Sequence, residues 1–222
     1  MLPALRHINC WIFDLDNCLY PASTNLFELI DIRMGQYIGR LLGVDRAEAR
    51  RVQKGYFHEH GTTLAGLMKT HGADPHEFLD FVHDIELAQI TADPEVVAAI
   101  ELLPGRKFVF TNGSEQYASR VLEKLGLANA FDGMHDIHAM EYVPKPNPIS
   151  YAALCDRHGI NPKTALFAED MARNLKPAKA LGMTTVWIDN GSEQASDNDD
   201  LSFIDYRSSD INLWLKDILG KA

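Results

Sequence analysis

The chain has 222 residues, of which 46% are hydrophobic and 23% are charged, and its formal net charge is −10 at pH 7. This composition is ordinary for a globular protein and excludes a fibrous or disordered chain. So acidic a chain lacks the basic surface that nucleic acid and anionic lipid require, so we expect no nucleic-acid polymer and no membrane as a partner.

Three cysteines without the spacing of a paired motif indicate free thiols in a reducing compartment. No apolar run approaches the length of a membrane span. The acidic run Asp14-Leu15-Asp16 comes too early in the chain for a signal peptide. We therefore expect a cytoplasmic protein.

Five short segments are predicted to be strands of a parallel sheet, because most of them are near-continuous apolar runs. Apolar side chains at helical spacing follow the later strands, around residues 117–125, 175–182 and 211–219. This alternation of strands and helices predicts an open α/β sheet. The five predicted strands are residues 8–13, 107–110, 133–137, 164–168 and 184–188.

Residues 14–106 separate the first two predicted strands, which is far too long for one crossover helix or for an unstructured loop. Apolar residues step by three and four through this interval, for example at Leu26, Ile30, Met34 and Tyr37. We therefore predict an all-helical insertion over residues 20–91. Residues 190–200 are polar and predict a solvated loop before the last helix.

Ligands bind outside the carboxyl ends of the strands in an open α/β sheet, so the residues that follow each strand are candidates for a site. Carboxylates follow the first and fourth predicted strands, a threonine, an asparagine and a glycine follow the second, and a lysine between two prolines precedes the fourth. These residues are Asp14, Asp16, Thr111, Asn112, Gly113, Lys145, Glu169 and Asp170. The topology predicts that they meet at one edge of the sheet.

Carboxylates gathered at one edge repel one another, and a divalent cation relieves that repulsion. Oxygen ligands completed by water suit Mg²⁺, so we expect Mg²⁺ as the cofactor. Its expected ligands are Asp14, Asp16, Glu169 and Asp170.

The same edge carries groups that bind phosphate. Thr111 offers a hydroxyl, and Asn112 and Gly113 offer backbone N–H groups at the start of a helix, where the dipole favours an anion. Lys145 adds a compact positive charge. A metal, anion donors and free carboxylates together indicate phosphoryl transfer.

Asp14 and Asp16 are two residues apart, so in extended backbone both carboxylates point to the same side. One can attack phosphorus while the other exchanges a proton with the leaving-group oxygen.

Four motifs resemble, in this order, those of the haloacid dehalogenase-like (HAD) hydrolase superfamily, and the resemblance covers essentially the whole chain. They are residues 14–20, residues 111–113, Lys145-Pro146 and Glu169-Asp170. The resemblance implies a Rossmann-like, doubly wound parallel sheet with an all-helical cap inserted after the first strand. It divides the chain into a catalytic core, residues 1–19 and 92–222, and a cap, residues 20–91.

The resemblance also implies a role for each motif residue. Asp14 matches the nucleophile that becomes an aspartyl-phosphate, and Asp16 matches the general acid/base, with its backbone carbonyl as a metal ligand. Thr111 matches the phosphate-binding hydroxyl, and Lys145 matches the lysine that steadies nucleophile and phosphate. Glu169 and Asp170 match the acidic pair of the metal site, with Asp170 preferred as the direct ligand.

Two positions depart from the family pattern. Cys18 stands where Thr or Val is usual, and we interpret it as a small buried hydrophobe. Glu169 stands where many members have Asp, which leaves open whether Glu169 or Asp170 contacts the metal.

A narrower resemblance, to the pyrimidine 5′-nucleotidase branch, rests on Tyr20-Pro21, on residues 174–187 and above all on residues 56–67 of the cap. It implies a small-molecule phosphate monoester as substrate, namely a pyrimidine nucleoside monophosphate hydrolysed to nucleoside and phosphate. The cap candidates for substrate contact are Tyr56, His60, Thr62 and Thr63.

Several alternatives stay open at this point. Another HAD phosphatase or a phosphomutase would act on a small sugar phosphate, and a 2-haloacid dehalogenase would attack carbon without a metal or a second aspartate. A phospho-accepting receiver module is shorter and has no Asp-x-Asp, and a phosphate-binding pseudoenzyme would not need both aspartates and Lys145. The sequence is compatible with a monomer or a homodimer.

Overall fold

The computed structural model describes residues 1–191 and 200–220. Its centre is a sheet of six strands, all parallel, in the order β3-β2-β1-β4-β5-β6. The strands are β1 (Cys10–Phe13), β2 (Arg106–Phe110), β3 (Gly133–His135), β4 (Ala165–Glu169), β5 (Thr184–Ile188) and β6 (Tyr206–Ser208). The predicted doubly wound sheet and its five strands are confirmed, and β6 is an additional edge strand.

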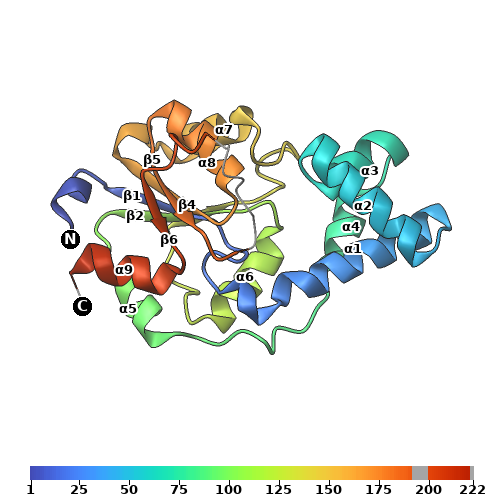
Figure 1. Cartoon of the computed structure of the whole chain (residues 1–222), viewed down its shortest axis with the longest axis horizontal. Coiled ribbons are helices and arrows are strands. Elements are labelled where there is room, and N and C mark those ends of the chain that lie inside the picture. Colours follow the sequence, from blue (N-terminus) through green and yellow to red (C-terminus); the bar gives the residue numbers. More distant parts are fainter. Residues whose placement is uncertain (192–199, 221–222) are drawn as a thin grey trace.

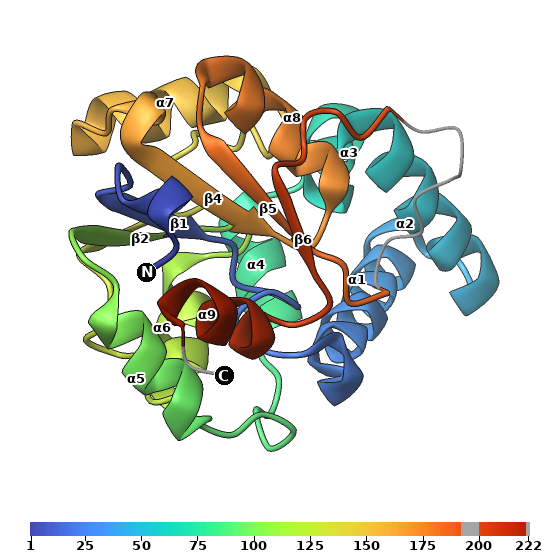
Figure 2. The same cartoon turned by 60° about the vertical axis from the view of Figure 1, so that its left-hand side comes forward.

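The sheet is covered on both faces, as buried parallel strands require. Helices α5 (Pro94–Leu102), α6 (Glu115–Lys124) and α9 (Ile211–Leu219) lie on one face, and α7 (Pro148–His158) and α8 (Ala172–Leu181) lie on the other (Figures 1 and 2). All four residues of β1 are buried between β2 and β4. The chain leaves β1 toward β2 and later returns to β4, so the sheet reverses its winding at the carboxyl end of β1, where open α/β sheets bind ligands.

The predicted helical insertion is present between β1 and α5. It consists of α1 (Leu26–Leu42), α2 (Arg46–His60), α3 (Thr63–His71) and α4 (Pro75–His83). The four helices stand together to one side of the sheet, joined to it by residues 20–25 and 84–93 (Figure 1). Tyr37 of α1 packs edge-on against Phe78 of α4, with ring centroids 5.1 Å apart. Apolar contacts of this kind hold the helices of the insertion to one another.

The insertion touches the core beside the carboxyl ends of the strands. Gly61 ends α2 with φ +83, and a Cβ placed there would lie 3.9 Å from the carbonyl oxygen of Lys145. The guanidinium carbon of Arg173 in α8 lies 4.3 Å above the ring of Phe57 in α2, in cation–π geometry. These contacts seat the helical insertion over the edge at which the sequence predicts a site.

The observed strand bounds differ from the predicted ones for local reasons. β3 ends at His135 instead of residue 137, because Asp136 turns the chain: its carboxylate accepts hydrogen bonds from the backbone N–H groups of Glu115 (2.8 Å) and Ala139 (2.9 Å). Of the polar loop predicted at residues 190–200, residues 192–199 lie outside the described part of the chain. Among the described residues, every helix is too short or too polar to cross a bilayer.

We predict that the fold loses stability as the pH falls from 7 to 5. Burial lowers the pKa of His135 to about 4 and that of His83 to about 3. Both stay neutral in the fold but take up protons in the unfolded chain below about pH 6.5, so acid favours unfolding. Between pH 7 and pH 5, His135→Leu should lose less free energy of unfolding than the wild type, by on the order of 1–2 kcal/mol. Urea unfolding at pH 7, 6 and 5 measures this difference.

Replacement of an exposed histidine, His7→Gln, serves as the control and should keep the wild-type pH dependence. If His135→Leu also kept the wild-type slope, burial of a neutral His135 would not be a source of the pH dependence.

Candidate active site

The centre of the site is the ammonium group of Lys145, which is 2% exposed. Its Nζ donates three hydrogen bonds, to Asp14 Oδ1 (2.7 Å), Glu169 Oε2 (2.7 Å) and the backbone carbonyl of Phe110 (2.8 Å). An ammonium has three N–H donors, so each of them has a partner. Lys145 therefore ties together the carboxyl ends of β1, β2 and β4.

The three charges are mutually dependent. Burial opposes ionisation of Lys145 and Glu169, but their attraction outweighs it, so the pKa of Lys145 is raised and that of Glu169 is lowered. The pKa of Asp14 is raised well above its usual value, because burial and the neighbouring charge of Glu169 outweigh the attraction of Lys145. Three buried carboxyl groups, those of Asp14, Glu169 and Asp170, therefore lie around one ammonium group.

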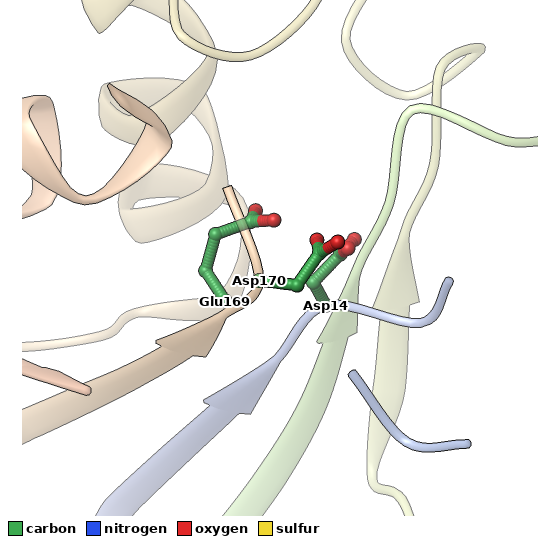
Figure 3. A group of neighbouring side chains, drawn as sticks. All are labelled: Asp14, Glu169 and Asp170. Carbon is green, nitrogen blue, oxygen red and sulfur yellow. The ribbon is translucent and has the colours of Figure 1, made fainter. Parts of the chain in front are cut away.

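Three carboxylates of this cluster fit a divalent cation. One oxygen from each of Asp14, Glu169 and Asp170 lies within 4.8 Å of the others, and all three residues are buried. Figure 3 shows the three carboxylates just beyond the ends of β1 and β4, with Asp14 and Asp170 side by side. Carboxylate oxygens are the donors that Mg²⁺ prefers, and a cation here would relieve the repulsion that raises the pKa of Asp14.

The side chain of Asp16 lies in a different environment from these three carboxylates. Its Oδ1 accepts hydrogen bonds from the phenols of Tyr20 (2.5 Å) and Tyr117 (2.8 Å). Burial raises the pKa of Asp16, and the two hydrogen bonds oppose that rise. The Asp16 side chain therefore lies outside the carboxylate group of Asp14, Glu169 and Asp170, and the resemblance assigns a metal contact to its backbone carbonyl alone.

The residues that follow β2 form a tight turn beside Lys145. Thr111 is 1% exposed, and its hydroxyl accepts a hydrogen bond from the backbone N–H of Gly113 (2.9 Å), so the Gly113 N–H that the sequence offers to phosphate is bonded within the turn. Asn112 accepts from the backbone N–H of Lys145 (2.9 Å) and donates to its carbonyl (3.2 Å). The Asn112 side chain therefore positions the Lys145 loop, a role the sequence does not reveal.

The predicted cap contacts have structural partners within the insertion. The Tyr56 phenol lies 2.7 Å from Nε2 of His71, and the Tyr56 and His60 rings are 5.8 Å apart. The Thr62 hydroxyl caps α3 by accepting from the N–H of Ala65 (3.1 Å), and the buried Thr63 hydroxyl donates to the carbonyl of Gln53. Their contact with substrate stays a prediction.

Cys18 lies beneath the site as a buried thiol. It is 1% exposed, and its Sγ is 3.5 Å from the carbonyl oxygen of Ala168. Burial raises the pKa of Cys18 well above its usual value, so the thiol stays protonated. This placement agrees with the interpretation of Cys18 as a small buried side chain.

Sequence reasoning missed Tyr20, Tyr117 and Arg173 as parts of the site. Tyr117 is the first residue of the apolar stripe at residues 117–125, in which the spacing predicts only packing against the sheet, although a phenol needs a polar partner when buried. Arg173 lies at the start of α8, just after the acidic pair. A basic residue three positions after Asp170 is the available signal for it.

The chain belongs to the haloacid dehalogenase-like hydrolase family, whose model matches residues 8–182. Among named relatives, Phosphate metabolism protein 8 of Saccharomyces cerevisiae is 27% identical over 94% of this chain and 70% of its own length. The (S)-2-haloacid dehalogenase of Xanthobacter autotrophicus is 27% identical over 60% of this chain and 52% of its own length. A HAD phosphatase from Thermococcus onnurineus shares the fold, with a TM-score of 0.65 at 20% identity, covering 96% of this chain and 99% of that one.

Removal of the central cation tests the charge balance of the site. In Lys145→Met the carboxylates of Asp14 and Glu169 lose their buried partner, so the free energy of unfolding at pH 8 should fall by about 3–5 kcal/mol. Part of this loss, relative to wild type, should be recovered at pH 5.5, where the unpaired carboxylates can take up protons. Urea unfolding of both proteins at the two pH values measures it.

Lys179→Met is the matched control, because it breaks a partly exposed ion pair with Asp205 (2.6 Å). It should cost less than about 1 kcal/mol, as is usual for surface pairs. Equal losses in the two variants would contradict the central role of Lys145 in the charge balance.

Proposed function

We propose that this protein is a Mg²⁺-dependent phosphomonoesterase that works through an aspartyl-phosphate on Asp14. The observation that carries the proposal is the pairing of two different aspartate environments on one loop. Asp14 lies in the charged cluster with Lys145, Glu169 and Asp170, and Asp16 is held apart by two phenols. Carboxylates in contrasting environments suit a nucleophile and an acid/base.

In the first half of the reaction, an oxygen of Asp14 bonds to phosphorus while the bond from phosphorus to the leaving oxygen breaks. That leaving oxygen takes a proton from Asp16. Lys145, whose ammonium lies 2.7 Å from Asp14 Oδ1, would stabilise the negative charge of the phosphoryl group by its own positive charge, and the Thr111 hydroxyl, which accepts from the Gly113 N–H, would donate its proton to a phosphoryl oxygen.

In the second half, a water oxygen bonds to phosphorus and displaces the Asp14 oxygen. Asp16 takes a proton from that water, which restores the starting state and releases inorganic phosphate. Bound between Asp14, Glu169 and Asp170, Mg²⁺ would supply positive charge against the phosphoryl oxygens.

We propose a pyrimidine nucleoside monophosphate as the substrate and the helical insertion, residues 20–91, as the cap that covers it. Support comes from the resemblance of residues 56–67 to the pyrimidine 5′-nucleotidase branch and from the seat of the insertion beside Lys145. The match to a yeast protein named for phosphate metabolism agrees with a phosphate ester substrate.

A 2-haloacid dehalogenase is the second candidate, because a relative of that name matches the chain. Halide is a weak base that leaves carbon without taking a proton, so that reaction has no use for a general acid or a cation. The phosphatase is therefore favoured, because Asp16 is held by hydrogen bonds and because three carboxylates could bind a cation. These three belong to Asp14, Glu169 and Asp170.

A substrate panel tests the function directly. We expect phosphate release from UMP, CMP and dTMP to exceed that from AMP, GMP and sugar phosphates, and no halide release from 2-chloropropionate. EDTA should abolish the activity, and added Mg²⁺ should restore it. Halide release in the presence of EDTA would favour the dehalogenase, and an isomerised sugar phosphate would favour a mutase.

Substitution of the nucleophile tests the intermediate. Asp14→Asn should lower kcat by a factor of at least about 10³, because an amide oxygen is a poor nucleophile and forms no aspartyl-phosphate. Intact-mass measurement after rapid acid quench should show a phosphoryl adduct on the wild type and none on the variant. A variant with near-wild-type turnover would contradict the role of Asp14.

A further inference from the structure

The carboxylate of Asp16 is held by two tyrosines that come from separate parts of the chain. Tyr20 follows the first motif in the link to the insertion, and Tyr117 lies in the first turn of α6. Both phenols are 1% exposed, and both lie within 2.8 Å of the same oxygen, Oδ1. Asp16 itself is half-buried.

The hydrogen-bond inventory fixes which oxygen of Asp16 can carry a proton. A phenol has one O–H donor, and a carboxylate oxygen has two lone pairs. The two phenols lie 3.5 Å from each other but closer to Asp16, so each directs its proton to Oδ1 and together they fill it. In the part of the chain that the structure describes, no donor bonds to Oδ2, which is left to take up a proton.

We propose that Tyr20 and Tyr117 are positioning residues that make Oδ2 of Asp16 the atom that exchanges protons with substrate and water. The proposal rests on the proposed function, in which Asp16 is the general acid/base. As the bond from phosphorus to the leaving oxygen breaks, its electron pair goes to that oxygen, which takes the proton of Oδ2. In the second half, a proton of the attacking water returns to Oδ2.

The insertion supports this arrangement through His83, the last residue of α4. The His83 ring stacks on the Tyr117 ring, with centroids 4.3 Å apart and planes 10° apart. Its Nδ1 lies 3.0 Å from the Ser114 hydroxyl, and Arg120 donates to its backbone carbonyl (3.0 Å). His83 therefore holds the Tyr117 ring next to Asp16 when the insertion contacts α6. In this way the contact between the insertion and the core is linked to proton transfer.

Comparison of two leaving groups separates a role in proton transfer from a purely structural role, because loss of structure would slow both substrates alike. An alcohol must be protonated as it leaves, whereas dinitrophenolate leaves as a stable anion, so only the alkyl ester depends on the general acid. The quantity measured is kcat/KM, which covers the steps up to release of the leaving group, for the best alkyl phosphate of the panel and for 2,4-dinitrophenyl phosphate. Asp16→Asn is the reference variant for loss of the acid.

We expect Tyr20→Phe and Tyr117→Phe each to lower kcat/KM for the alkyl ester by about tenfold or more, as misplacement of a catalytic group does. The value for dinitrophenyl phosphate should change by less than about threefold, so the ratio of the two rates falls. His83→Ala should lower the same ratio, and His83→Phe, which keeps a stacking ring, should restore most of it.

Tyr151→Phe is the matched control, because it removes another buried phenol, which donates to the carbonyl of Asn174 (2.6 Å) and does not contact Asp16. It should leave the ratio of the two rates unchanged, whatever its effect on stability. Urea unfolding of every variant identifies any that fails to fold, and either single tyrosine variant is then sufficient for the test.

Three failures are distinguishable. If Asp16→Asn lowers the ratio but neither tyrosine variant does, the positioning proposal is overturned and the proposed function stands. If Asp16→Asn affects both substrates equally, the general-acid role itself fails. If the tyrosine variants lower the ratio and His83→Ala does not, the link to the insertion is overturned.

Discussion

The hydrogen bonds of the Lys145 ammonium are the interaction on which the rest of the site depends. They reach the carboxyl ends of three adjacent strands, at Asp14, Phe110 and Glu169. Without a cation at this point, the sheet would place negative charges together in a buried crevice, which is among the most costly arrangements in a protein. The order β2-β1-β4 brings these groups together, and the same ammonium that joins the three strand ends also balances the charge there.

One lysine does not neutralise the carboxylates around it, and the remaining charge gives the site its chemical character. Asp14, Glu169 and Asp170 offer oxygens close enough for one cation, which would offset both the burial and the neighbouring charge of Glu169 that raise the pKa of Asp14. Asp16 is two residues away from Asp14 in the sequence, yet its carboxylate accepts hydrogen bonds from two phenols instead of an ammonium group. Environment, more than residue type, separates the two aspartates.

The sequence predicts the sheet and the edge well, because both follow from local patterns. Buried parallel strands read as apolar runs, and the rule that ligands bind at strand ends then selects the carboxylates, Thr111 and Lys145. The sequence does not predict β6, because Tyr206–Ser208 is a short edge strand without an apolar run. It does not predict the phenols on Asp16, because a contact between residues 16 and 117 depends on where α6 lies, which no local pattern encodes.

The insertion touches the core beside Lys145 and beside the phenol that contacts Asp16. Gly61 approaches the backbone of Lys145, and His83 backs the phenol that holds Asp16. Phe57 lies under Arg173, three residues after Asp170. A shift of the insertion by an ångström or two would disturb these supports together, because close-packed contacts do not stretch. The insertion therefore helps to fix the positions of the Lys145 backbone and the Tyr117 phenol, and under the proposed function it shares in setting the geometry of the groups that act on the substrate.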